Sequence, residues 1–187
     1  MNFLLSLSGL IDGLNQRVGR TVQWLILFMV LISSGNAMVR YIFNNSSNAW
    51  LEVQWYLFAA VFLLCAGYTL QRNEHIRIDV IAGRLSRKTQ LWIDIVGTVA
   101  FLFPMALLIM TLSWPMFMKS FIHTEMSSDA GGLLRWPVKL LIPAGFFLLL
   151  LQGASELIKK IAILIGRLPD PGDQGHHHHT AADGEAA

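Results

Sequence analysis

The sequence predicts an all-α integral membrane protein with four transmembrane helices, an N-terminal amphipathic interfacial helix and a disordered C-terminal tail. Apolar residues make up 54% of the chain and charged residues only 14%, with a mean hydropathy of +0.51. An ordinary soluble domain carries about 25% charged residues, so this chain has too little charge to coat a surface in water. Four apolar stretches each reach the ~20 residues of a helical crossing, and backbone groups in lipid must pair within their own segment.

Residues 1–20 are predicted to form the amphipathic helix. Its apolar residues recur at helical spacing, namely Phe3, Leu4, Leu7, Leu10, Ile11, Leu14 and Val18. Polar residues fall between them, namely Asp12, Asn15, Gln16 and Arg17. A signal peptide carries its positive charge ahead of the apolar core, whereas here the charge follows it. We expect a helix that lies on the cytoplasmic membrane face or against a partner protein.

The transmembrane domain is predicted over residues 21–165. Its spans cover about 21–39, 50–70, 90–118 and 138–157. The third exceeds the length of a perpendicular crossing, so it is expected to tilt, or to kink near Pro104 or Pro115. Residues 166–187 are rich in Gly, Asp, His and Ala, and this composition is typical of disorder. The adjacent His176–His179 on such a tail make a poor specific metal site.

The positive charges predict the orientation. Ten Lys and Arg residues lie before the first span, between the second and third, or after the fourth: Arg17, Arg20, Arg72, Arg77, Arg84, Arg87, Lys88, Lys159, Lys160 and Arg167. The other side holds four: Arg40, Lys119, Arg135 and Lys139. Because cytoplasmic loops carry the excess of Lys and Arg, both termini are expected in the cytoplasm.

Ionisable groups within the spans are few, and none falls at the bilayer centre. Asp94 and Glu156 lie toward the cytoplasm, and Glu52 lies in the first turn of the second span. Such groups are either used in transport or catalysis, or paired. Pairing is the favoured interpretation: Asp94 and Glu156 with bases such as Lys88, Lys159 or Lys160, and Glu52 with Arg40.

No enzyme site, cofactor site or metal site emerges from the sequence. His75 and His123 lie in loops on opposite sides, which excludes haem ligation between helices. The single cysteine, Cys65, excludes an internal disulfide, and the formal charge of +2 gives no sign of a nucleic-acid partner. A transporter acting alone is disfavoured, because no internal repeat or mid-depth polar cluster is found.

Small residues instead indicate close helix packing. They are Ser33 and Ala37 in the first span, Ala59, Ala60, Ala66 and Gly67 in the second, Gly97 and Ala100 in the third, and Ala144, Gly145, Gly153 and Ala154 in the fourth. Small residues let helix backbones approach closely in lipid. They offer more packing surface than one small bundle needs, which suggests a larger partner.

Two segments resemble a known family. The first runs from Arg40 to Asp79 and the second from Gly131 to Lys159. The pattern is carried by Arg40, Phe43, Trp50, Glu52, Gly67, His75 and Asp79, and by the run Arg135, Trp136 and Pro137. Over roughly residues 15–165 the chain resembles the small membrane subunit (DctQ-like, or Q subunit) of tripartite ATP-independent periplasmic (TRAP) transporters. Its Ser-Ser-Asn-Ala-Trp-Leu-Glu and Arg-Trp-Pro runs are similar to the branch associated with 2-oxo acids, mannitol or chloroaromatic compounds.

The resemblance implies a multi-pass accessory subunit in the bacterial inner membrane. In that family a periplasmic substrate-binding protein (P) delivers an organic acid, and the large subunit (M) holds the substrate and sodium sites. The small subunit packs beside the scaffold of the large one. The alternative is an assembly or regulatory subunit of an unrelated membrane complex.

Individual roles follow from the same comparison and from position. Asn48 is expected to cap the second helix. Arg77, Arg84, Arg87 and Lys88 are expected to contact phospholipid headgroups. Within the loop over residues 119–139, Glu125, Asp129 and Arg135 either meet the binding protein or are only solvated.

Overall fold

The computed structural model describes residues 2–44, 47–72 and 86–169. Within these ranges the chain is helical, with one isolated β-bridge between Met126 and Leu134. Four helical runs are long and apolar enough to cross a membrane: α1 (Asn2–Phe43), α2 (Asn48–Gln71), the run Arg87–Ile122, and α6 (Trp136–Leu164). The predicted all-α class with four spanning helices is therefore confirmed.

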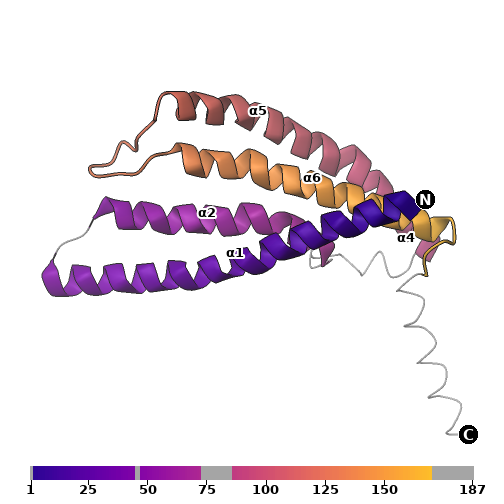
Figure 1. Cartoon of the computed structure of the whole chain (residues 1–187), viewed down its shortest axis with the longest axis horizontal. Coiled ribbons are helices and arrows are strands. Elements are labelled where there is room, and N and C mark those ends of the chain that lie inside the picture. Colours follow the sequence, from indigo (N-terminus) through magenta and orange to yellow (C-terminus); the bar gives the residue numbers. More distant parts are fainter. Residues whose placement is uncertain (1, 45–46, 73–85, 170–187) are drawn as a thin grey trace, which may run out of the picture.

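The helices lie side by side in the order α5, α6, α2 and α1 (Figure 1). The α1–α2 turn and the α5–α6 loop are at one end, and the N-terminus and the last turns of α6 are at the other. This arrangement places both ends of the helical region on one side, as the predicted topology requires. Which side faces the cytoplasm stays a prediction.

Helix α6 lies at the centre and packs closely against α2 through glycine. A Cβ atom added at Gly145 would lie 2.6 Å from the carbonyl oxygen of Leu63 in α2. Gly67 of α2 faces the Asn15 amide of α1, and its added Cβ would lie 3.2 Å from the Leu148 carbonyl oxygen of α6. No larger residue fits at Gly145 without moving the helices apart, because the clash there is with backbone, whereas at Gly67 an added Cβ would first meet Asn15 Oδ1.

The third span contains a change of helix type. Helix α4 (Arg87–Gly97) runs into the π-helical turn η1 (Thr98–Leu102), which continues as α5 (Phe103–Ile122). Pro104 has no N–H, and its ring collides with the carbonyl one α-helical turn earlier. The wider π turn directly before it relieves that collision. The disturbance predicted near Pro104 is thus present, whereas Pro115 lies inside α5 without interrupting it.

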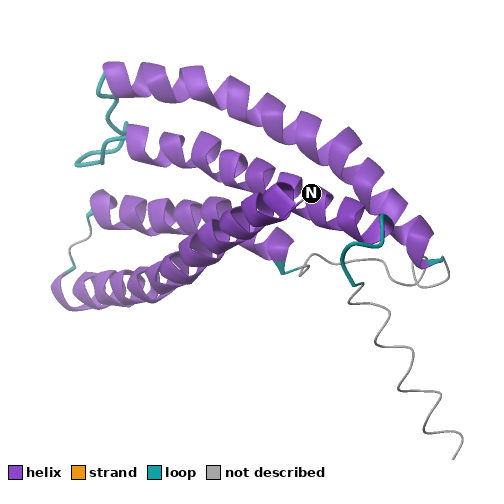
Figure 2. Cartoon of the chain, turned by 45° about the vertical axis from the view of Figure 1, so that its right-hand side comes forward, coloured by secondary structure: helices purple, strands orange, loops and turns teal. Residues whose placement is uncertain are grey.

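The first helix differs most from expectation. No break separates residues 1–20 from the first span, because α1 is continuous over 42 residues. Its length of about 63 Å is twice the ~30 Å hydrocarbon thickness. The face that packs inward is largely polar or small, with Ser8, Asn15 and Gly19 buried beside Ile11 and Val22, while Phe3 and Leu10 are 78% and 73% exposed. The polar face of this segment therefore packs against the chain's own helices, and its place at the membrane face stays a prediction. Figure 2 shows this half of α1 crossing the other helices.

Candidate functional site

A polar junction joins the first half of α1 to the last turns of α6. It comprises Ser8, Asp12, Asn15, Gln152, Ser155, Glu156 and Lys159. The α1 residues are spaced by four and three positions, and the α6 residues occupy positions i, i+3, i+4 and i+7, so each set lies on one face of its helix. Gln152, Asn15, Ser8 and Ser155 are all at most 2% exposed.

Asp12 is the centre of this polar junction. Its Oδ1 accepts hydrogen bonds from Ser155 Oγ at 2.7 Å and from Gln152 Nε2 at 2.9 Å. Its Oδ2 lies 2.8 Å from Lys159 Nζ, which also lies 2.7 Å from Glu156 Oε1. Two carboxylates therefore share one ammonium group, and neutral donors satisfy the remaining acceptor sites of Asp12.

Two further contacts extend the polar junction. Asn15 donates from Nδ2 to Gln152 Oε1 at 3.0 Å, and Gln71 of α2 donates from Nε2 to the Asp12 carbonyl oxygen at 3.3 Å. Beside it, Lys160 pairs with Asp94 of α4 at 2.9 Å. All four helical runs thus meet here. The predicted pairing of Glu156 with Lys159 and of Asp94 with Lys160 is confirmed. Most groups of the polar junction bond one another, which suits a structural tie, whereas Asn15 Oδ1 and Gln71 Oε1 are buried without a hydrogen-bond partner among the described residues.

The opposite end of the molecule holds a second cluster, which we call the loop anchor. It joins α2 to the loop between α5 and α6 through Glu52, Asn48 and Tyr56. Glu52 Oε2 accepts the backbone N–H of Leu133 at 2.6 Å. Asn48 Nδ2 donates to the Ala130 carbonyl oxygen at 3.3 Å, and Tyr56 Oη donates to that of Leu134 at 2.9 Å. The loop anchor brings together the two segments that carry the family resemblance.

The loop is also closed on itself. Ser127 N donates to Leu133 O and Arg135 N to Glu125 O, each at 2.9 Å. Glu125 forms an ion pair with Lys139 of α6. The Lys139 ammonium group beside Glu125 holds the pKa of that carboxyl below its ordinary value of 4.5. Glu125 and Arg135 therefore serve the loop's own structure, whereas Asp129 is exposed.

The loop anchor corrects two predictions. Glu52 does not pair with Arg40, because its carboxylate is taken by the Leu133 amide and is buried to 2% exposure. Asn48 does not cap α2: Ser47 holds the cap position, and Asn48 begins the helix with its side chain directed to Ala130. The sequence signal for a helix start leaves the cap residue uncertain by about one position. It also does not give the direction of a side chain that has a hydrogen-bond acceptor nearby in the folded chain.

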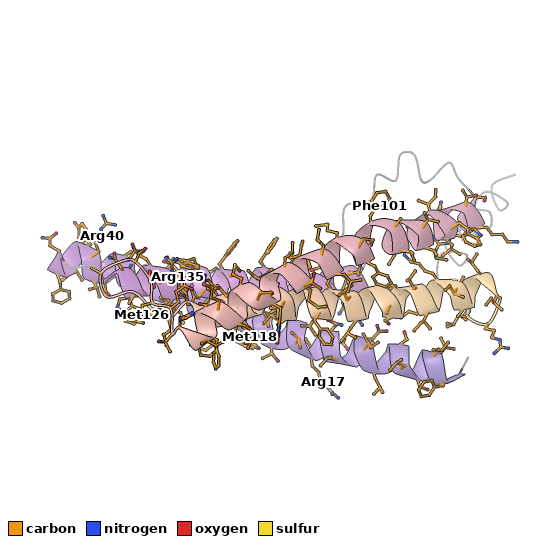
Figure 3. All side chains as sticks on the ribbon, turned by 90° about the horizontal axis from the view of Figure 1, so that it is seen from above. Arg17, Arg40, Phe101, Met118, Met126 and Arg135 are labelled. Atoms are coloured by element: carbon orange, nitrogen blue, oxygen red, sulfur yellow. The ribbon has the colours of Figure 1, made fainter. Side chains whose placement is uncertain are left out.

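The remaining predicted residues fall in different places. Phe43 ends α1 and is 70% exposed, and Trp50 is 53% exposed. Trp136 opens α6 and packs edge-on to Phe121 with ring centroids 5.4 Å apart. Pro137 lies in the first turn of α6, where no intrahelical donor is needed. Figure 3 shows Arg40 and Arg135 near the same end of the molecule.

Some predicted residues lie outside the described ranges: His75, Arg77, Asp79, Arg84 and His176–His179. Of the predicted lipid contacts, Arg87 begins α4 and donates from Nη1 to Gln90 Oε1 at 3.2 Å, and Lys88 is exposed. Over the described residues, no group of three or more His, Cys, Asp or Glu side chains is placed to hold a metal ion.

The polar junction is absent from the predictions made for α1, although the sequence carries a signal for it. Ser8, Asp12, Asn15 and Gly19 form a stripe at helical spacing, and Gln152, Ser155, Glu156 and Lys159 form another. Two complementary stripes in a chain this poor in charge indicate contact between the helices. The apolar positions of α1 suggested an interfacial helix instead. An apolar face meets lipid both in an interfacial helix and in a helix whose polar face packs against α6, so these positions do not distinguish the two.

Comparison with known families agrees with this arrangement of spans and motifs. Residues 29–162 match the family described as "Tripartite ATP-independent periplasmic transporters, DctQ component". Neither the curated proteins nor the solved structures gave a match. The family match covers more than half of the chain and includes the loop anchor together with the α6 side of the polar junction. The chain therefore belongs to the DctQ component family, the small membrane subunit of TRAP transporters.

Proposed function

We propose that this chain is the accessory subunit of a sodium-coupled TRAP transporter for organic acids, and that it braces the scaffold of the large membrane subunit. One observation carries the bracing role. In the most apolar window of each spanning helix, only 6%, 11%, 6% and 33% of the residues are buried within the chain. Most of the apolar surface thus faces outward. In a TRAP transporter the large membrane subunit is the partner against which this surface can pack.

The polar groups of the chain support the same role. Asp12, Glu156 and Lys159 satisfy one another, and Asp94 pairs with Lys160, at one end of the helices. Substrate and ion sites in transporters normally lie at mid-depth, where interrupted helices supply free polar groups. In the described residues the strongly polar clusters instead lie at the two ends and bond internally. We therefore assign the substrate and sodium sites to the large subunit.

The remaining parts of the proposal concern placement. We place the chain in the bacterial inner membrane with both termini in the cytoplasm, residues 1–20 at the interface and 21–165 across the membrane; the tail predicted over 166–187 lies outside the described residues from residue 170 onward. The bases Arg77, Arg84, Arg87 and Lys88 then face anionic headgroups. The substrate class we propose is an organic acid of the 2-oxo acid, mannitol or chloroaromatic branch.

The loop anchor supports a docking role for the α5–α6 loop toward the periplasmic binding protein. Glu52 fixes the Leu133 amide, and Glu125 pairs with Lys139, so the loop presents a preorganised surface. Its outermost acid, Asp129, is exposed and is the group we assign to that contact. Substituting Asp129→Lys tests this: the affinity of the binding protein for the assembled membrane complex should fall, and an unchanged affinity would remove the loop from the interface.

Co-expression with a large TRAP membrane subunit from the same organism tests the main proposal. We expect the two to co-purify, and we expect uptake of substrate into liposomes to require both together with the binding protein. Recovery of the chain with a membrane complex of another kind, and none with the large subunit, would support the alternative of an unrelated assembly subunit.

A further inference from the structure

A polar hollow lies between the last turns of α1 and the first turns of α2. We call it the α1–α2 hollow; it has a volume of about 570 Å³, and its walls include Ser33, Asn36, Ala37, Arg40, Leu51 and Gln54. It lies on the outside of the helix pair, since Ala37 and Arg40 are exposed. Figure 3 shows the Arg40 side chain directed away from the neighbouring helices.

The polar groups of the hollow have no partner within the described part of the chain. Asn36, Arg40 and Gln54 make none of the hydrogen bonds or ion pairs found among those residues. Glu52, the acid nearest to Arg40 in the sequence, is buried and accepts the Leu133 amide instead. The amides of the polar junction are bonded to each other at the other end of the molecule.

The unbonded amide side chains of the hollow cost free energy because they lie within the predicted spans. Against the predicted span over residues 21–39, Asn36 lies three residues inside the membrane boundary, which is about 4.5 Å along the helix axis, and Ser33 lies about one turn deeper. Amide groups at such depth lose their hydrogen bonds to water, and lipid tails offer none in return. A protein group that bonds to them therefore has to cover this face.

The shape of the hollow indicates a helix as the covering element. Ser33 and Ala37 lie one turn apart on the same face of α1 and present small side chains to the hollow. Small residues at this spacing allow a second helix to approach closely in lipid. The glycines of α2 and α6 already contact other helices of the chain. The small residues Ser33 and Ala37 instead line the hollow, so they are left open to a partner helix.

We propose that the α1–α2 hollow receives one transmembrane helix of the large subunit, with an acidic side chain opposite Arg40 and a polar side chain opposite Asn36 and Gln54. This rests on the proposed function. The charge of Arg40 selects the occupant. A second copy of this chain, packed symmetrically on the same face, would place two Arg40 groups together, and an acyl chain would leave both amides unbonded.

The test uses the complex assembled in native membranes, with Cys65 replaced by serine. Ala37→Cys, alkylated with a maleimide–benzophenone reagent and irradiated, should cross-link to the large subunit, while Ala100→Cys treated in the same way should not; Ala100 is the control because it is also an exposed alanine, in η1. Ala37→Phe should lower recovery of the large subunit at least about fivefold, and Ala100→Phe should leave it unchanged. The side chain of Ala37 is exposed, so Ala37→Phe leaves the fold of the chain intact.

The outcomes separate the two proposals. If the unsubstituted chain does not co-purify with the large subunit, the proposed function fails. If it does co-purify and Ala37→Phe binds as well as the unsubstituted chain, the hollow is not the interface and only this inference fails. A cross-link from Ala37→Cys to another copy of this chain would also overturn the inference, in favour of self-association.

Discussion

The contact between α2 and α6 gives the sharpest test of the packing described here. Replacing Gly145 by alanine adds one methyl group, and that Cβ would lie 2.6 Å from Leu63 O and 2.9 Å from Leu63 C. Both are backbone atoms, so no rotamer change relieves the clash. Ordinary contact begins at 3.4 Å, and the added methyl group falls about 0.8 Å short of it. The two helices have to move apart by a comparable amount.

The expected cost follows from overpacking. Inserting a methylene-sized group into a closely packed interface destabilises by ~1–3 kcal/mol, and separating α2 from α6 also loosens the contacts on either side. The matched control is Gly97→Ala in α4, because a Cβ added at Gly97 meets nothing within 4 Å. Alanine is the better helix former by up to ~1 kcal/mol, so this control should be neutral or stabilising.

The measurement is the free energy of unfolding of the purified chain in mixed micelles. Helix content is followed by circular dichroism as the fraction of denaturing detergent rises. We expect Gly145→Ala to unfold at a clearly lower fraction of denaturing detergent than the unsubstituted chain. Gly97→Ala should unfold at the same or a higher fraction of that detergent. Equal effects of the two substitutions would refute the close approach of α2 and α6.

Three further predictions concern the ends of the helices and the third span. Asp12→Ala and Lys159→Ala should each destabilise the chain, and a double-mutant cycle in the same unfolding assay should give a coupling of ~1–3 kcal/mol; additive effects would contradict the ion pair. Because the folded-state pKa of Glu125 is lowered, its contribution is present above pH 4.5 and is lost as pH falls through the lower folded-state pKa. Protection of the loop amides, taken relative to their intrinsic exchange rate at each pH, should fall there in the unsubstituted chain, and Glu125→Gln should remove that loss of protection; the same loss in both would exclude the Lys139 pair. Pro104→Ala should allow regular α-helical hydrogen bonds across Thr98–Leu102, detected as slower amide exchange, and unchanged exchange there would show that the π turn has another cause.

The spans were predictable because their signal is strong and local. About 20 apolar residues in a row specify a crossing whatever the tertiary structure, and α2 and α6 agree with the predicted ranges to within a few residues, apart from the C-terminal end of α6. The start of α1 was harder to predict. A polar stripe and an apolar stripe look alike whether the polar side meets water or another helix, so the burial of Asn15 depended on Gln152, which lies 137 residues away.

The partners of charged groups were predictable where the bases lie on the same helix or at the same end of the predicted bundle, as for Glu156 with Lys159 and Asp94 with Lys160. Glu156 and Lys159 are three residues apart on one helix, and their pairing follows from that spacing. Glu52 had a base close in sequence, Arg40, but the structure supplies a backbone amide from a loop 81 residues later. Backbone donors carry no sequence signal, so the loop anchor could not be found from side chains alone.

The central claim is that this chain supports transport without holding the transported substrate. The most direct test is uptake of radiolabelled organic acid, driven by a sodium gradient, into liposomes that contain this chain alone with its binding protein. We predict no uptake above empty liposomes, and uptake once the large subunit is added. Saturable, sodium-dependent uptake by this chain without the large subunit would contradict the claim.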